Sequence, residues 1–445
     1  MSDEKYQLLI DWLKQDNSFY LSPNIQIIED SYGGIGLACK GKKYLNEKLI
    51  SIPEKYMINI KTVERHVHMQ DELQKGDEKE RTKPSQNIYH KILHEDKNIM
   101  PDEYSTNQLI ILFMYVEMFI LAEKSFFYPF LQTLPTFETF LCSVPYLPDL
   151  LRMKQYEFKN KVSYAFLKHS NTIKRRIMDD WNTIKHILLN LNHSLDDDAN
   201  TSDKSRNTRI FQRFLHVSML INSRCLYYDI TEEKQDNFTL VPLVDFINHS
   251  VAVNGGHCYP KVNKLTRSFE IYSGSTTDFE GLNEVFFNYG AHSNDFLLSE
   301  YGFVVPNNPS DFIDITPRVL KLLNPIQIAF LSEIGYLGDY TVTYEDISFR
   351  TIVALALVSI TANNVAITTE QKSKMIKLIN GTLYETSFNY KKLLHTILQE
   401  ELDDCHEKLE LLRAEKEGGN KIITTFNSNI QIVYEGYLQI LKSVL

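Results

Sequence analysis

Cysteine is scarce in this 445-residue sequence, and the five cysteines are scattered along it. No two of them form a C-x-x-C pair, which argues against a disulfide framework and against a zinc site built from cysteines. Free thiols are typical of a reducing compartment, so we expect the protein in the cytoplasm, with the nucleus as an additional location. The cysteines are Cys39, Cys142, Cys225, Cys258 and Cys405.

Glycine and proline are also few, with 17 and 14 copies, which excludes a collagen-like or low-complexity chain. The most apolar run, residues 109–122, contains Glu117 and is shorter than the ~20 residues that a membrane-spanning helix needs. Ser105 and Gln108 form a capping-box pattern ahead of this run, so we expect a core helix and no membrane partner. The charged N-terminus lacks the apolar segment of a signal peptide and predicts an amphipathic helix.

A basic excess is absent, since the formal net charge is -10. This balance argues against nucleic acid as a direct ligand, because binding to its backbone depends on lysine and arginine. An acidic surface suits a basic protein partner, although simple solubility explains the same charge equally well. We expect a monomer that acts on a protein substrate.

Apolar residues are plentiful, because 43% of the chain is hydrophobic and 12% is aromatic, enough for cores in about two to three domains. Patterning predicts strands at both ends of a long, mostly helical stretch, and helices from Pro306 onward. The separated strand blocks require a fold that brings distant segments into one sheet. We expect a linker at 69–86, a loop at 192–207, a helix at 390–417, and strands at 25–28, 32–38, 49–53, 238–246, 268–272 and 284–289.

Two glycine-bearing segments resemble nucleotide-binding motifs but fail on one residue each. Residues 36–43 fit a phosphate-binding loop except at Lys43, which stands where a hydroxyl group would hold magnesium. Gly34-x-Gly36 does not complete a dinucleotide fingerprint, because Cys39 occupies the place of the third glycine. The sequence therefore gives little support to nucleotide binding.

Hydrolase and metal motifs are incomplete as well. The G-x-S-x-G pattern of many serine hydrolases does not occur. His66-x-His68 and His257-Cys258 are fragments with two ligands, whereas a structural zinc site needs four. We therefore expect no metal.

Three segments place polar residues or glycine where the pattern predicts a strand end or a core. Residues 240–250 run from apolar residues into Asn248-His249, residues 284–290 alternate toward Tyr289, and residues 300–306 contain Tyr301-Gly302-Phe303. Each segment alone is most simply a piece of hydrogen-bonded or packed structure. Their occurrence together in this order points to a shared site.

These segments belong to a longer series that resembles a known family. The series is GGIGLA at 33–38, LISIP at 49–53, LPTFET at 134–139, Asn222-Ser223-Arg224, LVPLVDFINHS at 240–250 and FFNYGAHSNDFLLSEYGFVVP at 286–306. It is similar to the SET-domain protein lysine methyltransferases of the Rubisco large-subunit methyltransferase type, which use S-adenosylmethionine. The resemblance implies an α+β fold of small twisted sheets with a pseudoknot. It places a SET domain at 20–305, with a helical insertion at about 61–225, and a helical substrate-binding domain at 306–445.

The resemblance also implies roles for single residues. Tyr289 would orient the incoming amine and stabilise methyl transfer, while Asp245 would brace the site. The cofactor would be held by Gly34, Ile35, Gly36, Arg224, Asn248, His249 and Tyr289. Either Gly33 or Gly34 can correspond to the first glycine of the family motif.

The lysine channel implied by the resemblance consists of Phe287, Tyr301 and Phe303. An apolar channel suits a nucleophile that must arrive neutral, because desolvation lowers the lysine pKa from about 10.4. Water can then take the proton, so no dedicated base is required.

The substrate is expected to be a non-histone protein, because no cysteine cluster of the kind found in many histone-directed enzymes follows residue 306. By analogy, a ribosomal protein or a translation factor is the expected target. A catalytically silent SET-fold scaffold is the alternative, and methylation of histidine or another side chain is a third interpretation.

Overall fold

The computed structural model describes residues 4–30, 34–66, 89, 104–153, 158–193, 203–230, 237–251, 256–361, 366–414 and 421–445. The chain packs into two compact units. The first contains Met1–Phe140 and Lys174–Gly290, and the second contains Leu141–Ile173 and Ala291–Leu445. The fold is α+β, as predicted, while the predicted domain boundary at residue 305 stays a prediction.

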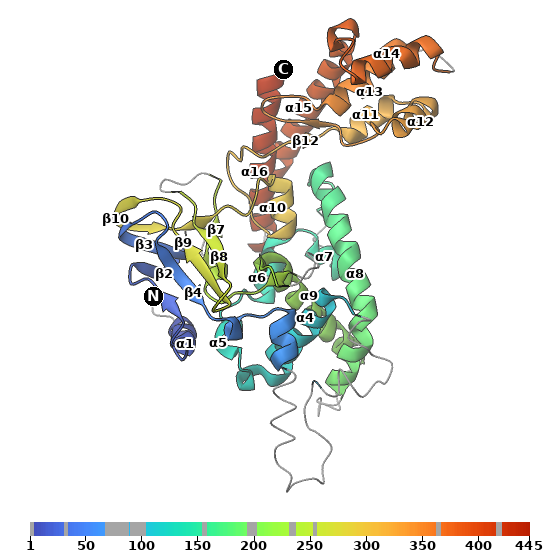
Figure 1. Ribbon diagram of the computed structural model, residues 1–445. Coiled ribbons are helices and arrows are strands. Elements are labelled where there is room, and N and C mark those ends of the chain that lie inside the picture. Colours follow the sequence, from blue (N-terminus) through green and yellow to red (C-terminus); the bar gives the residue numbers. More distant parts are fainter. Residues whose placement is uncertain are drawn as a thin grey trace. The chain divides into compact units, whose positions relative to one another are not determined.

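The first unit holds the sheets that position the site (Figure 1). One sheet has the order β1 (Tyr20–Leu21), β4 (Lys48–Ile52), β9 (Ser268–Tyr272), β8 (Tyr259–Asn263). A second has the order β10 (Thr277–Glu284), β3 (Ile35–Lys43), β2 (Ile25–Glu29). Two-stranded pairs join β7 (Asn248–His249) to β11 (Phe286–Phe287) and β5 (Leu226–Tyr227) to β6 (Phe238–Thr239).

Strands from the start of the chain pair with strands from beyond residue 258, as the separated strand blocks predicted. Ser51 lies opposite Glu270, and Ala38 lies opposite Glu284, in antiparallel register. The central strands are buried on both faces over most of the paired region. In β3 four consecutive residues, 36–39, are buried, and in β4 the last four, 49–52, are buried. Distant segments therefore depend on one another for their hydrogen bonds.

Two of the predicted strands are shorter than expected. In segment 238–246 only β6 is a strand, because Pro242 cannot donate a ladder hydrogen bond and Leu243 has a φ of 67°. A 3-10 turn, Val244–Phe246, follows. Segment 284–289 contains only the last residue of β10, Glu284, and the two residues of β11. Burial of Val285 and Phe287 still follows the predicted alternation.

Helices surround these sheets in the first unit. They include α1 (Glu4–Leu13), α4 (Thr106–Tyr115), α5 (Tyr128–Leu131) and α9 (Asp203–Arg224), and the unit boundaries cut through α6 (Phe137–Ser143) and α8 (Tyr164–His193). The loop predicted at 192–207 is too long at both ends, because helical hydrogen bonding continues to residue 193 and resumes at residue 203. The linker predicted at 69–86 lies outside the described residues.

The predicted core helix is confirmed, including its capping box between Ser105 and Gln108. It continues as a π-helix, Val116–Leu121. Thr106–Lys124 is long and apolar enough to cross a membrane, but residues 110–117 are buried within the first unit. Glu117 is buried there and accepts hydrogen bonds from the hydroxyls of Tyr89 and Ser125.

The second unit is mainly helical. Its helices include α7 (Leu147–Leu150), α10 (Asn294–Glu300), α11 (Thr316–Leu322), α12 (Pro325–Glu333), α13 (Phe349–Thr361), α14 (Thr369–Ile379), α15 (Lys391–Ala414) and α16 (Lys421–Val444). The prediction of helices alone after Pro306 is wrong, because β12 (Ile313–Asp314) pairs with β13 (Thr341–Val342). The leucine spacing predicted α15, whose buried stripe packs against α16.

Candidate active site

The parallel pairing of β7 with β11 brings two predicted site segments together. Asn248 lies opposite Phe286, and His249 lies opposite Phe287. Two residues further on, the backbone N–H of Tyr289 donates to His249 Nδ1 at 3.1 Å. Residues separated by about forty positions are thus neighbours, through strand pairing and one hydrogen bond to a side chain.

Tyr289 is fixed at both ends. Its hydroxyl donates to the carbonyl oxygen of Ile247 at 2.8 Å, and its ring lies 5.1 Å from the His249 ring between centroids. Because His249 Nδ1 accepts a hydrogen bond, a proton on the neutral imidazole sits on Nε2. The phenol is therefore held in one orientation before any ligand binds.

The side-chain amide of Asn248 lies among oxygen atoms. Its Nδ2 donates to Glu284 Oε1 at 2.7 Å, to Asp30 Oδ2 at 3.2 Å and to the carbonyl of Ile35 at 3.2 Å. Asp30 also accepts the backbone N–H of Gly34 at 2.8 Å. This side chain therefore ties the β2–β3 hairpin to the Asn-His segment.

The glycines of the hairpin make room for these carboxylates. A Cβ at Gly36 would lie 2.5 Å from Glu284 Oε1, and one at Gly34 would lie 2.6 Å from Asp30 Oδ2. The resemblance implied that Gly34 and Gly36 hold the cofactor, and the structure supplies a separate reason for their small size. Gly33 lies outside the described residues.

Sequence reasoning missed Asp30 and Glu284 as members of the site. Burial raises the pKa of Glu284, and the negative charge of Asp30 raises it further, while the hydrogen bond from Asn248 acts in the opposite direction. The only available signal was an acidic residue at the start of the segment that leads to Tyr289.

Arg224, the last residue of α9, lies against Asp245. Its Nη1 donates to the backbone carbonyl of Asp245 at 2.8 Å and lies 3.6 Å from Oδ2. Burial raises the pKa of the Asp245 carboxyl to about 6, although the charge of Arg224 acts against this shift. Arg224 thus contacts the turn that precedes Asn248, and its predicted part in holding the cofactor stays a prediction.

The predicted channel residues belong to both units. Phe287 is buried in the first unit. Tyr301 and Phe303 lie in the second, with ring centroids 5.9 Å apart, and Gly302 between them has a φ of 81°. Burial raises the pKa of Tyr301. A channel formed by all three residues stays a prediction.

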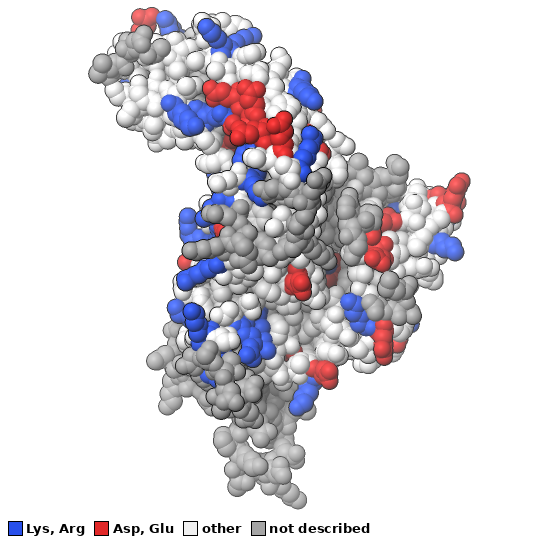
Figure 2. Space-filling model, turned by 180° about the vertical axis from the view of Figure 1, so that it is seen from behind, with Lys and Arg blue, Asp and Glu red and all other residues white. Residues whose placement is uncertain are grey.

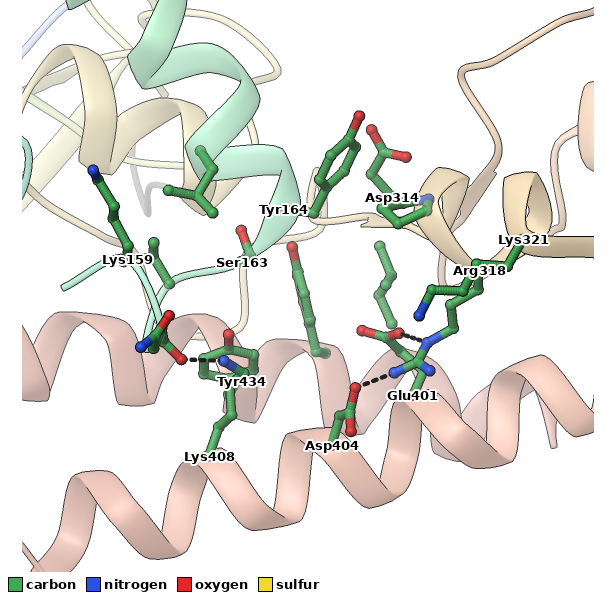
Figure 3. Close-up of a pocket in the computed structure, with 16 residues that line it drawn as sticks. Lys159, Ser163, Tyr164, Asp314, Arg318, Lys321, Glu401, Asp404, Lys408 and Tyr434 are labelled. Carbon is green, nitrogen blue, oxygen red and sulfur yellow. Dashed lines mark hydrogen bonds and ion pairs between the residues drawn. The ribbon is translucent and has the colours of Figure 1, made fainter.

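A cavity of about 420 Å³ lies within the second unit (Figure 3). Arg318 of α11 forms ion pairs there with Glu401 and Asp404 of α15, and with Glu400 at 3.1 Å. Lys408 donates to the carbonyl of Asn160 at another part of the wall. The wall combines charges of both signs with tyrosine rings.

The histidine and cysteine fragments noted in the sequence do not form a cluster within the part of the chain that the structure describes. No group of three or more histidine, cysteine or acidic residues that could hold a metal occurs there. His66 lies near Glu117, His257 Nε2 contacts the carbonyl of Ser250, and Cys258 is a buried free thiol. His68 lies outside the described residues.

Comparisons with known proteins show which proteins this chain is similar to. Residues 311–445 match the family described as the Ribosomal lysine N-methyltransferase 2 C-terminal domain. Ribosomal lysine N-methyltransferase 2 of Saccharomyces cerevisiae is 31% identical over 99% of this chain and 98% of its own length. Ribosomal lysine N-methyltransferase set11 of Schizosaccharomyces pombe is 30% identical over 43% of this chain and 50% of its own. The solved structure of Rubisco LSMT bound to AdoMet has a TM-score of 0.60 at 16% identity, covering 98% of this chain and 90% of that one.

Proposed function

Because this chain belongs to the SET-domain lysine methyltransferases of the ribosomal type, we propose that its target is a lysine side chain of a ribosomal protein. It is a protein-lysine N-methyltransferase that depends on S-adenosylmethionine. One observation carries the assignment to this site: the β7–β11 pairing holds Asn248, His249 and Tyr289 together.

The residues around Asn248 fit this cofactor. When bound, S-adenosylmethionine supplies a methyl group on a positively charged sulfur. The carboxylates of Asp30 and Glu284 give this part of the site negative charge, which suits a cationic ligand. Gly34, Ile35, Gly36, Asn248 and His249 would hold the cofactor, and Arg224 with Asp245 would keep the turn before Asn248 in place.

Tyr289 would act on the incoming amine. Its hydroxyl hydrogen is directed to Ile247, so the phenol oxygen can accept an N–H of the substrate amine and aim the nitrogen lone pair. Holding the amine in line for displacement is the main contribution that the protein can make to such a transfer.

The substrate lysine must lose a proton before it reacts. Phe287, Tyr301 and Phe303 would surround the side chain, and the loss of water lowers its pKa because the ammonium form is disfavoured. The proton would leave to water. The predicted order of events therefore requires no side chain that acts as a base.

Charge and similarity support a ribosomal target. Proteins that bind RNA carry many lysines and arginines, which complement a chain of net charge -10. Figure 2 shows acidic side chains gathered over part of the C-terminal helices, and α15 contributes Glu400, Glu401 and Asp404 around Arg318. A translation factor or a catalytically silent scaffold remains an outcome of the test.

The test uses ribosomes from cells that lack this gene, incubated with purified protein and labelled S-adenosylmethionine. We expect label on one ribosomal protein band, at a lysine identified by mass spectrometry. Tyr289→Phe is expected to reduce the rate ~100-fold, because it removes one oriented oxygen at the reacting centre. Tyr384→Phe is the control, since Tyr384 is 80% exposed.

Each other outcome would contradict part of the proposal. Label confined to a non-ribosomal protein would exclude the ribosomal target, and label on histidine would change the acceptor. Absence of both label and cofactor binding would favour the scaffold. A Tyr289→Phe variant as active as the control would remove Tyr289 from the chemistry.

A further inference from the structure

Asp30 and Glu284 converge on a single amide nitrogen, that of Asn248. Two carboxylates that share one neutral partner repel each other. Burial raises the pKa of Glu284, and the charge of Asp30 raises this pKa further. Glu284 forms no ion pair with a lysine, arginine or histidine of the described chain. The carboxylate of Glu284 therefore favours a positively charged group close to Asn248.

The same contacts fix the orientation of the Asn248 amide. All three neighbours of Nδ2 are acceptors, namely Glu284, Asp30 and the carbonyl of Ile35, so the nitrogen end of the amide must face them. The carbonyl oxygen Oδ1 then lies at the opposite end. It can accept a hydrogen bond from a ligand that carries an ammonium group.

We propose that Glu284 and Asp30 are positioning residues that orient Asn248 toward the ammonium group of S-adenosylmethionine and make the site prefer this cofactor to its product. This inference rests on the proposed function. S-adenosylmethionine has a net charge of about +1 near neutral pH from its ammonium, carboxylate and sulfonium groups, whereas S-adenosylhomocysteine lacks the sulfonium charge. A negative pair beside the ligand therefore favours the methyl donor and helps to release the product.

The hairpin glycines are part of this arrangement. The Glu284 carboxylate reaches Asn248 through the space that a side chain at residue 36 would fill. Asp30 reaches it while holding the N–H of Gly34. The position of the acid pair therefore depends on the same hairpin that the sequence assigned to the cofactor.

The experiment measures binding of S-adenosylmethionine and S-adenosylhomocysteine by titration calorimetry to full-length wild type and Glu284→Gln. Glutamine keeps the shape and an acceptor oxygen for Asn248 but removes the charge. We expect S-adenosylmethionine to bind about tenfold more weakly and S-adenosylhomocysteine to change by less than about threefold. Glu280→Gln is the matched control, because Glu280 is an exposed acid on the same strand, and it should change neither ligand.

The outcomes separate this inference from the proposed function. Wild type that binds neither ligand would contradict the proposed function itself. Wild type that binds both, with Glu284→Gln weakening both equally, would show a purely structural role and overturn the inference. Unchanged binding of S-adenosylmethionine to Glu284→Gln would overturn it as well. Circular dichroism and thermal melting establish that the variant is folded.

Discussion

At the scale of single residues, the site contains carboxyl groups whose ionisation is opposed by burial. Asp245 lies in a 3-10 turn directly before the Asn-His segment, and its pKa is raised to about 6. The positive charge of Arg224 offsets part of the desolvation cost of the ionised Asp245 carboxylate, but the pKa stays raised. The ionised carboxylate of Asp245 therefore lowers the free energy of unfolding at neutral pH.

Asp245→Asn is expected to stabilise the protein at pH 7.5 and to have little effect at pH 4. The folded-state pKa is about 6, above the usual 3.8, so the folded state retains the proton as pH rises and stability falls between these values. The cost at pH 7.5 is at most ~3 kcal/mol, and the amide avoids it. Urea denaturation at both pH values measures the difference.

Asp278→Asn serves as the control, because Asp278 is exposed on β10. It should change stability by less than about 0.5 kcal/mol at either pH. A gain from Asp245→Asn that is the same at pH 4 and pH 7.5 would contradict the assignment of the effect to ionisation.

At the scale of elements, the β2–β3 hairpin packs closely against Glu284 at the end of β10. A methyl group at residue 36 would overlap the Glu284 carboxylate and lie 3.2 Å from Asn248 Nδ2. Neither side chain can move without breaking the hydrogen bond between them. A change in the packing of the hairpin is therefore expected to change the orientation of the Asn248 amide as well.

Gly36→Ala is expected to weaken S-adenosylmethionine binding about tenfold and to lower the free energy of unfolding by ~1–2 kcal/mol, through overpacking. Gly281→Ala in β10 is the matched control, because no atom lies within 4 Å of its Cβ position. Calorimetry and urea denaturation give the two quantities. Equal behaviour of the two variants would show that Glu284 moves aside at no cost.

The ion cluster between α11 and α15 supports a second prediction at this scale. Arg318→Ala leaves the Glu401 side chain, which is 18% exposed, without its main cation. We expect the free energy of unfolding to fall by ~2 kcal/mol because a largely buried charge loses its partner. Arg413→Ala, at an exposed position of α15, should have an effect below about 0.5 kcal/mol. A thermal melt that does not distinguish the two variants would contradict this expectation.

The sequence anticipated the segments of the site better than the contacts within it. Asn248, His249 and Tyr289 were grouped correctly, and their roles stay predictions. Asp30 and Glu284 were missed because each meets Asn248 across a long stretch of chain, and an isolated acidic residue carries no local pattern. The strand predicted at 238–246 is too long for a different reason, because Pro242 cannot donate a ladder hydrogen bond and Leu243 has a positive φ.

At the scale of the whole molecule, net charge is the property most relevant to the protein target. A chain with a charge of -10 attracts a basic protein over a distance of about a Debye length, which is ~10 Å at 0.1 M salt. Groups around Asn248 are partly buried and are screened less. Salt should therefore affect the two substrates differently.

Raising the salt concentration from 0.05 to 0.3 M is expected to increase KM for the ribosomal protein roughly tenfold, while KM for S-adenosylmethionine changes less than about threefold. Steady-state rates with either substrate varied measure both values. The same series with potassium glutamate in place of chloride controls for specific ion effects. A KM for the protein that is independent of salt would argue against recognition by charge.

The pairing of early strands with late ones has a consequence for synthesis of the chain. β3 and β4 emerge first, but the partners on their free sides, β10 and β9, follow more than two hundred residues later. A polypeptide that stops between residues 53 and 258 leaves both edges without a neighbour, and open edges of this kind recruit other chains. Prematurely terminated products should therefore aggregate or require chaperones, whereas a chain that has passed residue 290 can close its sheets.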